Sequence, residues 1–144
     1  MSSEDNKVIV QRLFGEVFNE KRLDRADELV APDYLDHGAV PGQAPGLEGA
    51  KQQRWAMYFA AIPDLHATID DLVAGEDKVV VRYTAEGTQQ GELLGIPPTG
   101  KRFRTSGICI YRLAEGKVAE VWEQMDMLGL MQQLGVIPAP GSTR

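Results

Sequence analysis

One acidic residue, Glu123, lies in a stretch whose alternate positions are otherwise apolar. Residues 118–125 alternate as in a β-strand with one buried face, and Glu123 shares that face with Val121 and Met125. Burial among apolar side chains disfavours the ionised form of a carboxyl group. Such a group can take a proton from a carbon beside a carbonyl and return it to an oxygen, which is general acid/base chemistry. Alternatively, Glu123 pairs with an arginine or reaches solvent at the end of the strand.

The face that Glu123 occupies depends on the turn before its strand. Ala114-Glu115-Gly116 is typical of a three-residue bulged hairpin, with Gly116 in the left-handed region. Leu113 then pairs with Lys117, and Cys109 pairs with Val121. In this register one face is charged, and the other is apolar apart from Glu123 and a few hydroxyl groups. The apolar face carries Phe103, Thr105, Gly107, Cys109 and Tyr111 beside Ala119, Val121, Glu123 and Met125. This pattern predicts a strand pair that lines a cavity.

Few other side chains could bind or react. His37 follows a short hydrophobic stretch beside a glycine- and proline-rich loop, so it lines a pocket mouth or caps the loop. His66 falls on a polar face and is expected in solvent, and Asp126 is expected to cap the last helix. Cys109 has no evident cationic neighbour, so we expect a small buried hydrophobic residue rather than a nucleophile. The predicted pocket residues are His37, Trp55, Tyr58, Tyr83, Phe103, Cys109, Val121 and Met125, although the helical spacing of Trp55, Tyr58 and Phe59 also fits a plain core.

Motifs and composition exclude several classes of protein. No metal-ligand spacing, dinucleotide-binding glycine motif, phosphate-binding loop or nucleophile elbow occurs, so we expect neither a metal nor a nucleotide cofactor. The net charge of −6 disfavours nucleic acid as a partner, despite a local cluster of Lys101, Arg102 and Arg104 that fits a solvated edge or a subunit contact. The apolar runs are shorter than the ~18 residues of a membrane span. With one cysteine and a polar, acidic N-terminus, a cytoplasmic location is expected.

The elements that must position Glu123 follow from hydrophobic periodicity. Helical spacing predicts a first helix around residues 10–17, with a capping box at Ser2-x-x-Asp5, a second over residues 24–30 that stops before Pro32, and a third over residues 47–61. Alternation predicts strands over residues 65–70, 79–88, 102–113 and 118–125, before a short helix over residues 127–134 and a loose tail from about residue 136. Residues 1–144 are therefore expected to form one α+β domain. Three N-terminal helices would pack on a curved antiparallel sheet, giving a cone with a central cavity.

Four segments together resemble a known family: residues 32–37 (PDYLDH), 95–101 (GIPPTGK), 116–126 (GKVAEVWEQMD) and 130–135 (LMQQLG). They are similar to the SnoaL-like polyketide cyclases, also called ester cyclases, of the nuclear-transport-factor-two-like superfamily. The resemblance implies intramolecular aldol condensation without cofactor or metal, and homodimers formed through the sheet. It also implies a catalytic carboxylate on the last strand, at Glu123 where characterised members carry aspartate. The family's nearby histidine falls on Cys109.

Three functions are compatible with these residues. The first is a cofactor-free cyclase or isomerase that acts on a small apolar carbonyl compound, with Glu123 as acid/base. The second is a non-catalytic binding module with the same cavity. The third is an epoxide hydrolase or dehydratase of the same superfamily, which would need two carboxylates and an arginine in the pocket, whereas the predicted inward faces offer one carboxylate and no arginine. The opposite sheet face mixes charge with large apolar groups and predicts a homodimer through the sheet; it carries Arg102, Arg104, Ile108, Ile110, Arg112 and Trp122.

Overall fold

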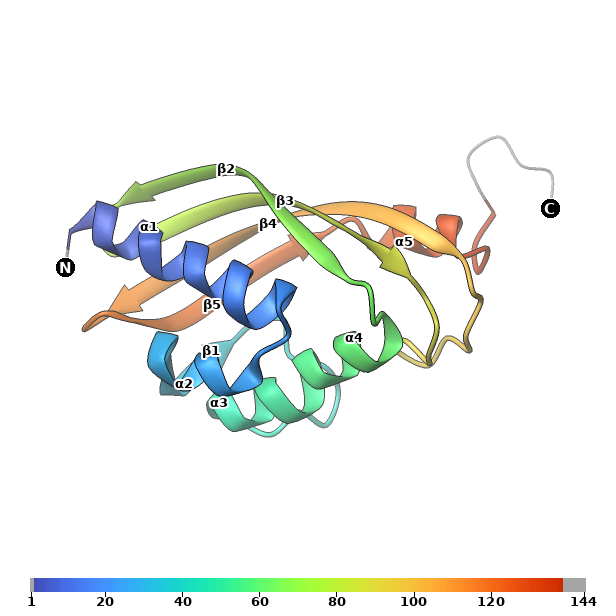
Figure 1. Ribbon diagram of the computed structural model, residues 1–144, viewed down its shortest axis with the longest axis horizontal. Helices are drawn as coiled ribbons and strands as arrows, with labels where there is room; N and C mark the ends of the chain where they lie inside the picture. Colours follow the sequence, from blue (N-terminus) through green and yellow to red (C-terminus); the bar gives the residue numbers. More distant parts are fainter. Residues whose placement is uncertain (1, 139–144) are drawn as a thin grey trace.

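Five strands form one mixed sheet in the order β1-β5-β4-β3-β2 (Figure 1). The structure, a computed structural model, describes residues 2–138, so the last part of the expected tail lies outside the described residues. The strands are β1 (Val30–Asp36), β2 (His66–Gly75), β3 (Lys78–Thr88), β4 (Arg102–Ala114) and β5 (Lys117–Met125). Strands β2 to β5 form an antiparallel meander, whereas β1 runs parallel to β5. The predicted α+β class is confirmed, and the wholly antiparallel sheet is corrected to a mixed one.

Strand β1 was not expected because its sequence interrupts the usual strand pattern. Pro32 and Asp33 are both unfavourable in a central strand. The strand lies at the edge of the sheet, where a residue without an N–H is tolerated, and its register against β5 shifts between Val30 and Leu35. Its last residue, Asp36, ends beside the middle of β5 through the pairing with Val121.

Helices α1 to α4 cover one face of this sheet, as predicted for the N-terminal helices (Figure 1). Helix α1 (Ser3–Arg12) has the expected capping box at Ser2 and continues as η1 (Leu13–Asn19). A short helical pair, η2 (Leu23–Arg25) and α2 (Ala26–Leu29), precedes β1. The third helical segment runs without a break through α3 (Gly46–Gly49), η3 (Ala50–Trp55) and α4 (Ala56–Ala61), and α5 (Met127–Gln133) follows β5. Among residues 2–138, no helix is both long and apolar enough to cross a membrane.

The β4–β5 hairpin differs in register from the prediction. Its turn is the two-residue type, with Glu115 at φ 52° and Gly116 at φ 79°, so Ala114 pairs with Lys117. A bulge at Ala119 then adds one residue to β5. The turn and the bulge together displace the predicted pairing by two positions, so Cys109 pairs with Glu123 and not with Val121. Because side chains alternate with a period of two, every side chain beyond the bulge keeps its predicted face.

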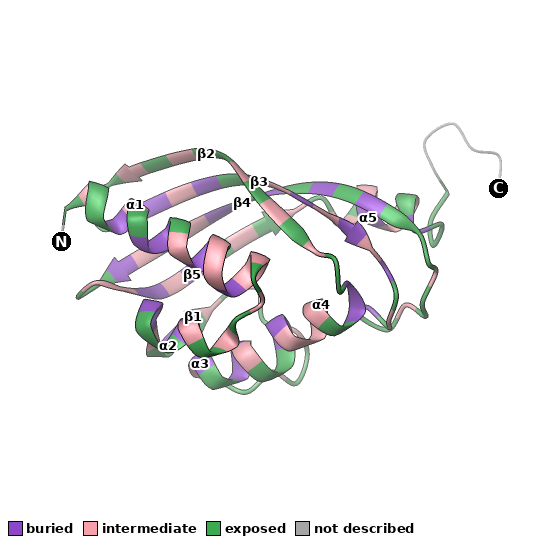
Figure 2. Ribbon diagram, viewed as in Figure 1, coloured by how far each residue is buried: buried purple, intermediate pink, exposed green. Residues whose placement is uncertain are grey.

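Two groups of buried side chains lie between the helices and the sheet. Along β3 and β4, buried and more exposed residues alternate, so that one face of each strand is in the core (Figure 2). The larger group, the first core cluster, joins η1, η3 and the middle of the sheet and includes Tyr34, Trp55, Tyr83 and Tyr111. The second core cluster consists of Ala61, Ile62, Leu93, Phe103, Leu130 and Leu134.

Candidate active site

A cavity of about 350 Å³ lies between the helices and the inner face of the sheet. This volume is in the range of small-molecule sites, and most of the wall is apolar or aromatic, as such sites require. Six of the predicted pocket residues line it, namely Trp55, Tyr58, Tyr83, Phe103, Val121 and Met125. Their contact with a ligand stays a prediction.

Glu123 faces this cavity from β5, and its side chain is 20% exposed. Each of its two carboxylate oxygens has a partner. The Tyr83 hydroxyl donates a hydrogen bond to Oε2, and the Arg54 guanidinium donates one to Oε1 from Nη2. A carboxylate held at both oxygens has a fixed orientation, which is the arrangement that proton transfer from a positioned carbon requires.

Tyr83 reaches Glu123 because a glycine lies opposite it in the sheet. Tyr83 of β3 pairs with Gly107 of β4, and a Cβ atom at position 107 would lie 2.6 Å from Cζ of the tyrosine ring. The glycine therefore makes room for the ring. Burial raises the pKa of Tyr83, and the nearby Glu123 carboxylate raises it further, so the hydroxyl stays protonated and serves as a donor.

Arg54 corrects the expectation that the pocket holds no arginine, and Asp36 adds a second carboxylate behind it. From η3, Arg54 bridges Glu123 and Asp36, and its Nη1 lies 2.6 Å from Asp36 Oδ1. The exposed fractions are only 11% for the Arg54 side chain and 4% for that of Asp36. Burial works against the charge of Arg54, but Glu123 and Asp36 outweigh it, and the pKa of Arg54 is raised. Asp36 also accepts hydrogen bonds from the Gly38 N–H at 2.8 Å and from Gln43.

The arrangement makes Glu123 one member of a buried ion cluster rather than a lone carboxylate among apolar groups. Arg54 itself lines the cavity, whereas Asp36 does not and lies behind it. Sequence reasoning missed Arg54 because a charged residue is normally placed on the solvent face of a helix. Its spacing from Tyr58 was the available signal, because residues four apart share one helix face.

Two predicted pocket residues, His37 and Cys109, are absent from the cavity wall. His37 is the first residue after β1; its backbone N–H still bonds to the Val121 carbonyl, and its side chain lies on the outer face of the sheet. There its Nε2 lies 2.7 Å from Glu120, and its ring stacks on Trp122 at 5.0 Å. Cys109 is 2% exposed within the sheet. Burial raises the pKa of its thiol, and Glu123 adds to the effect, so Cys109 fits the expected small buried residue.

Two other sequence predictions outside the pocket are confirmed. His66 is exposed at the start of β2. Asp126 caps α5, since its Oδ1 accepts a hydrogen bond of 2.8 Å from the Gly129 N–H.

The close fit of Tyr83 against Gly107 gives the first testable prediction. Gly107→Ala is expected to destabilise the protein by about 1–3 kcal/mol, the usual cost of overpacking, because the new Cβ would meet a rigid ring. Gly15→Ala is the matched control: it lies in η1 with no atom within 4 Å of the added Cβ, and it should stabilise by about 0.5–1 kcal/mol. Urea unfolding followed by circular dichroism measures both. Equal stability of the Gly107→Ala variant and the wild type would contradict the packing described.

Comparison with known families adds an independent observation. The family described as SnoaL-like polyketide cyclase matches residues 8–134. The chain is 29% identical over 131 residues to the aklanonic acid methyl ester cyclase DnrD of Streptomyces peucetius, covering 88% of both chains. It is 28% identical over 123 residues to a nogalonic acid methyl ester cyclase of Streptomyces nogalater, covering 82% of this chain and 89% of the relative.

Solved structures show the same fold over nearly the whole chain. TsrD from Streptomyces laurentii superposes with a TM-score of 0.87 at 32% identity, covering 95% of this chain and 99% of TsrD. IdmH from Streptomyces antibioticus superposes with a TM-score of 0.78 at 32% identity, covering 91% and 99% of the two chains.

Proposed function

The chain belongs to the SnoaL-like polyketide cyclase family, and we propose that it closes a ring in a small, largely apolar carbonyl compound with Glu123 as the acid/base. The observation that carries this proposal is the position of the Glu123 carboxylate. It faces an apolar cavity while Tyr83 and Arg54 hold its two oxygens. A base in a low-dielectric cavity with a defined orientation is suited to abstraction of a proton beside a carbonyl group.

The proposed reaction needs only the substrate and protein side chains. The carboxylate of Glu123 takes a proton from the carbon beside one carbonyl, and the electron pair of the broken C–H bond delocalises onto that carbonyl oxygen. The resulting carbanion attacks a second carbonyl carbon of the same molecule and forms the new C–C bond. The alkoxide then takes the proton back from the carboxyl group of Glu123. The product is an isomer of the substrate, and Glu123 returns to its starting form.

Arg54 supplies the charge beside Glu123 in this proposal. The family resemblance implies a histidine at position 109, where this chain has a cysteine. The raised pKa of Cys109 leaves a neutral thiol at physiological pH, so it adds no cation. The pKa of Arg54 is raised, so its guanidinium stays charged and holds the carboxylate of Glu123 in a fixed direction.

The names of the relatives suggest the substrates to test. The two relatives named above are cyclases of aklanonic acid methyl ester and nogalonic acid methyl ester. The cluster formed by Asp36, Arg54 and Glu123 has a net negative charge, which favours a ligand without a free carboxylate. We therefore propose a polyketide ester as the substrate class. Purified protein incubated with aklanonic acid methyl ester and with nogalonic acid methyl ester should yield a product of unchanged mass and altered retention. Recovery of both esters unchanged would count against this substrate class.

The hydrolase alternative gains one observation, because two carboxylates and an arginine do converge at the site. A hydrolase would need both carboxylates to reach substrate or water, however, and the Asp36 side chain is 4% exposed and lies behind Arg54. Incubation with a simple epoxide separates the two functions, since its hydrolysis would add the mass of one water, whereas ring closure of the esters adds none.

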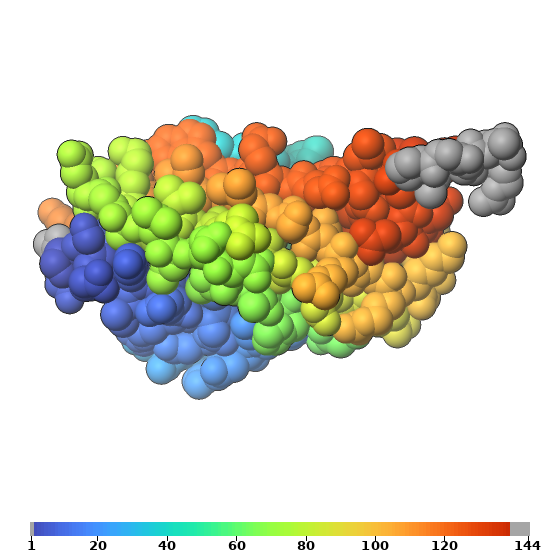
Figure 3. Space-filling view, turned by 90° about the horizontal axis from the view of Figure 1, so that it is seen from above, coloured from blue at the N-terminus to red at the C-terminus, as the bar shows by residue number. Residues whose placement is uncertain are grey.

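We also propose a homodimer through the outer face of the sheet. Figure 3 views this side of the molecule, which helices α1 to α4 leave uncovered. Two large apolar side chains lie on it, Ile108 at 49% exposure and Trp122 at 37%. Light scattering at micromolar concentration should give the mass of a dimer, and Ile108→Lys should shift it toward the monomer. A monomeric wild type would contradict the proposal.

A further inference from the structure

The second core cluster gives the cavity an apolar end. Four of its members, Ile62, Leu93, Phe103 and Leu130, line the cavity, and none of their side chains carries a polar atom. Leu93 is 1% exposed. Leu134 belongs to the same cluster and is 2% exposed, but it does not line the cavity. A ligand whose polar part reaches Glu123 would place its apolar part against this cluster.

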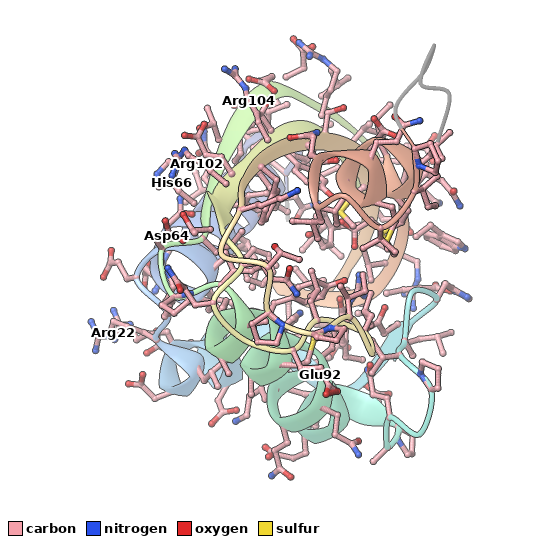
Figure 4. All side chains as sticks on the ribbon, turned by 90° about the vertical axis from the view of Figure 1, so that its right-hand side faces the viewer. Arg22, Asp64, His66, Glu92, Arg102 and Arg104 are labelled. Carbon is pink, nitrogen blue, oxygen red and sulfur yellow. The ribbon has the colours of Figure 1, made fainter. Side chains whose placement is uncertain are left out.

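Leu93 comes from a loop and not from a helix or strand. The loop joins β3 to β4, and Figure 4, which views the molecule from this side, shows it passing between the sheet and α4, with the adjacent Glu92 labelled. At its tip, Leu93 and Ile96 exchange two backbone hydrogen bonds of 2.8 and 3.0 Å around a two-residue turn. The first residue of that turn, Leu94, has φ 49°, a backbone conformation that residues other than glycine rarely adopt. Such a conformation persists only where the surrounding structure imposes it.

A single buried side chain, Gln89, holds this loop. Its exposure is 0%, and its amide nitrogen lies 3.1 to 3.2 Å from three backbone carbonyl oxygens, those of Gly91, Ile96 and Pro97. Its amide oxygen accepts a hydrogen bond of 2.7 Å from Thr99. The backbone N–H groups of residues 90 and 91 also bond to the Ala61 carbonyl, which ties the loop to the end of α4. Buried and fully bonded side-chain amides make a loop rigid.

We infer that Leu93 is a specificity-determining residue that limits how long an apolar group the cavity accepts, and that Gln89 is the positioning residue that holds Leu93 there. The inference rests on the proposed function in that the ligand is an apolar carbonyl compound. The loop is a fixed wall, because its backbone is bonded at the base, at the tip and to α4. A flexible lid would leave such groups to solvent.

Straight-chain alkyl phenyl ketones, from acetophenone to decanophenone, test this inference by calorimetric titration. Affinity for the wild type should rise about fourfold per added methylene, which is the value of burying one such group. When the chain is long enough to meet Leu93, the affinity should stop rising, and this chain length is the break in the series. Leu93→Ala removes three carbon atoms from the wall, so the break should move to chains about three methylenes longer. Leu93→Val, a milder variant that removes one carbon, should move it by about one methylene.

Leu134→Ala is the matched control, since it deletes the same atoms from the same cluster without touching the cavity wall. It should leave the break unchanged. If the wild type shows a break and neither Leu93 variant moves it, the inference is wrong while the proposed function stands. If no ketone binds to the wild type, both the inference and the apolar carbonyl ligand of the proposed function are overturned.

Gln89→Glu tests the positioning role, because it keeps the shape of the side chain and replaces the amide nitrogen near three carbonyl oxygens by a second acceptor oxygen. Hydrogen exchange of the amides of residues 90–100 should accelerate at least tenfold, with the exchange of β4 and β5 unchanged. The break in the ketone series should disappear, since the wall can then yield. An unchanged break together with unchanged exchange would show that Gln89 does not hold Leu93 in place.

Discussion

Replacing Glu123 with glutamine is expected to lower turnover by about 10²–10⁴-fold while ligand affinity changes little. The amide keeps the size of the side chain and can still bond to Tyr83 and Arg54, but it cannot accept a proton from carbon. This loss corresponds to about 3–5 kcal/mol of activation free energy. Turnover is measured with whichever methyl ester proves active, and affinity is measured by titration.

Glu123→Asp provides the matched comparison. It keeps the ionisable group and withdraws it by one methylene, so it should lose less activity than the glutamine variant. A glutamine variant that retains more than about a tenth of the wild-type rate would show that Glu123 is not the catalytic group. If the wild type binds the ester without turnover, and the glutamine variant alters only its affinity, the protein is the binding module and not the enzyme.

Replacing Arg54 with methionine is expected to have the second largest effect. The substitution leaves the carboxylates of Asp36 and Glu123 facing each other without a cation, and breaking a buried ion pair in this way costs about 3–5 kcal/mol of folding stability.

Arg25→Met is the control, because it removes the same group from ion pairs with Glu16 and Glu28 in which the arginine is 34% exposed, against 11% for Arg54. Exposed ion pairs contribute about 0–1 kcal/mol, so this variant should unfold at nearly the wild-type urea concentration. An Arg54→Met variant that matches Arg25→Met in stability would contradict the buried cluster.

The inward position of Glu123 could be predicted from the sequence even though the register could not. Side chains alternate with a period of two, so a displacement of the pairing by two positions leaves Glu123 on its predicted face. The bulge at Ala119 was not visible because Val118 and Ala119 are both apolar and both buried, and a pair of apolar residues fits either register. The alternation of apolar and polar residues therefore predicted the sheet face of Glu123, but it did not predict which residue of β4 pairs with Glu123.

The partners of Glu123 could not be predicted, because they depend on contacts between segments far apart in the chain. Arg54 becomes a buried residue only because Asp36 and Glu123, 18 and 69 residues away in sequence, neutralise it. Asp36 in turn is placed by strand β1, which was not expected because it contains Pro32, a residue that is unfavourable in a strand. His37 was expected at the pocket mouth or as a cap of the glycine- and proline-rich loop beside it, and the strand that ends at Asp36 leaves it on the outer face instead.

Hydrogen–deuterium exchange at carbon tests most directly whether Glu123 transfers a proton. The probe is aklanonic acid methyl ester in which the carbonyl that would accept the new bond is reduced to an alcohol, so that deprotonation can occur but the ring cannot close. In deuterium oxide, the wild type should introduce deuterium beside the remaining carbonyl, detected as a gain in mass, and Glu123→Gln should do so at least 10²-fold more slowly. Equal exchange by the two proteins, or no exchange above the rate without protein, would contradict the assignment of Glu123 as the base.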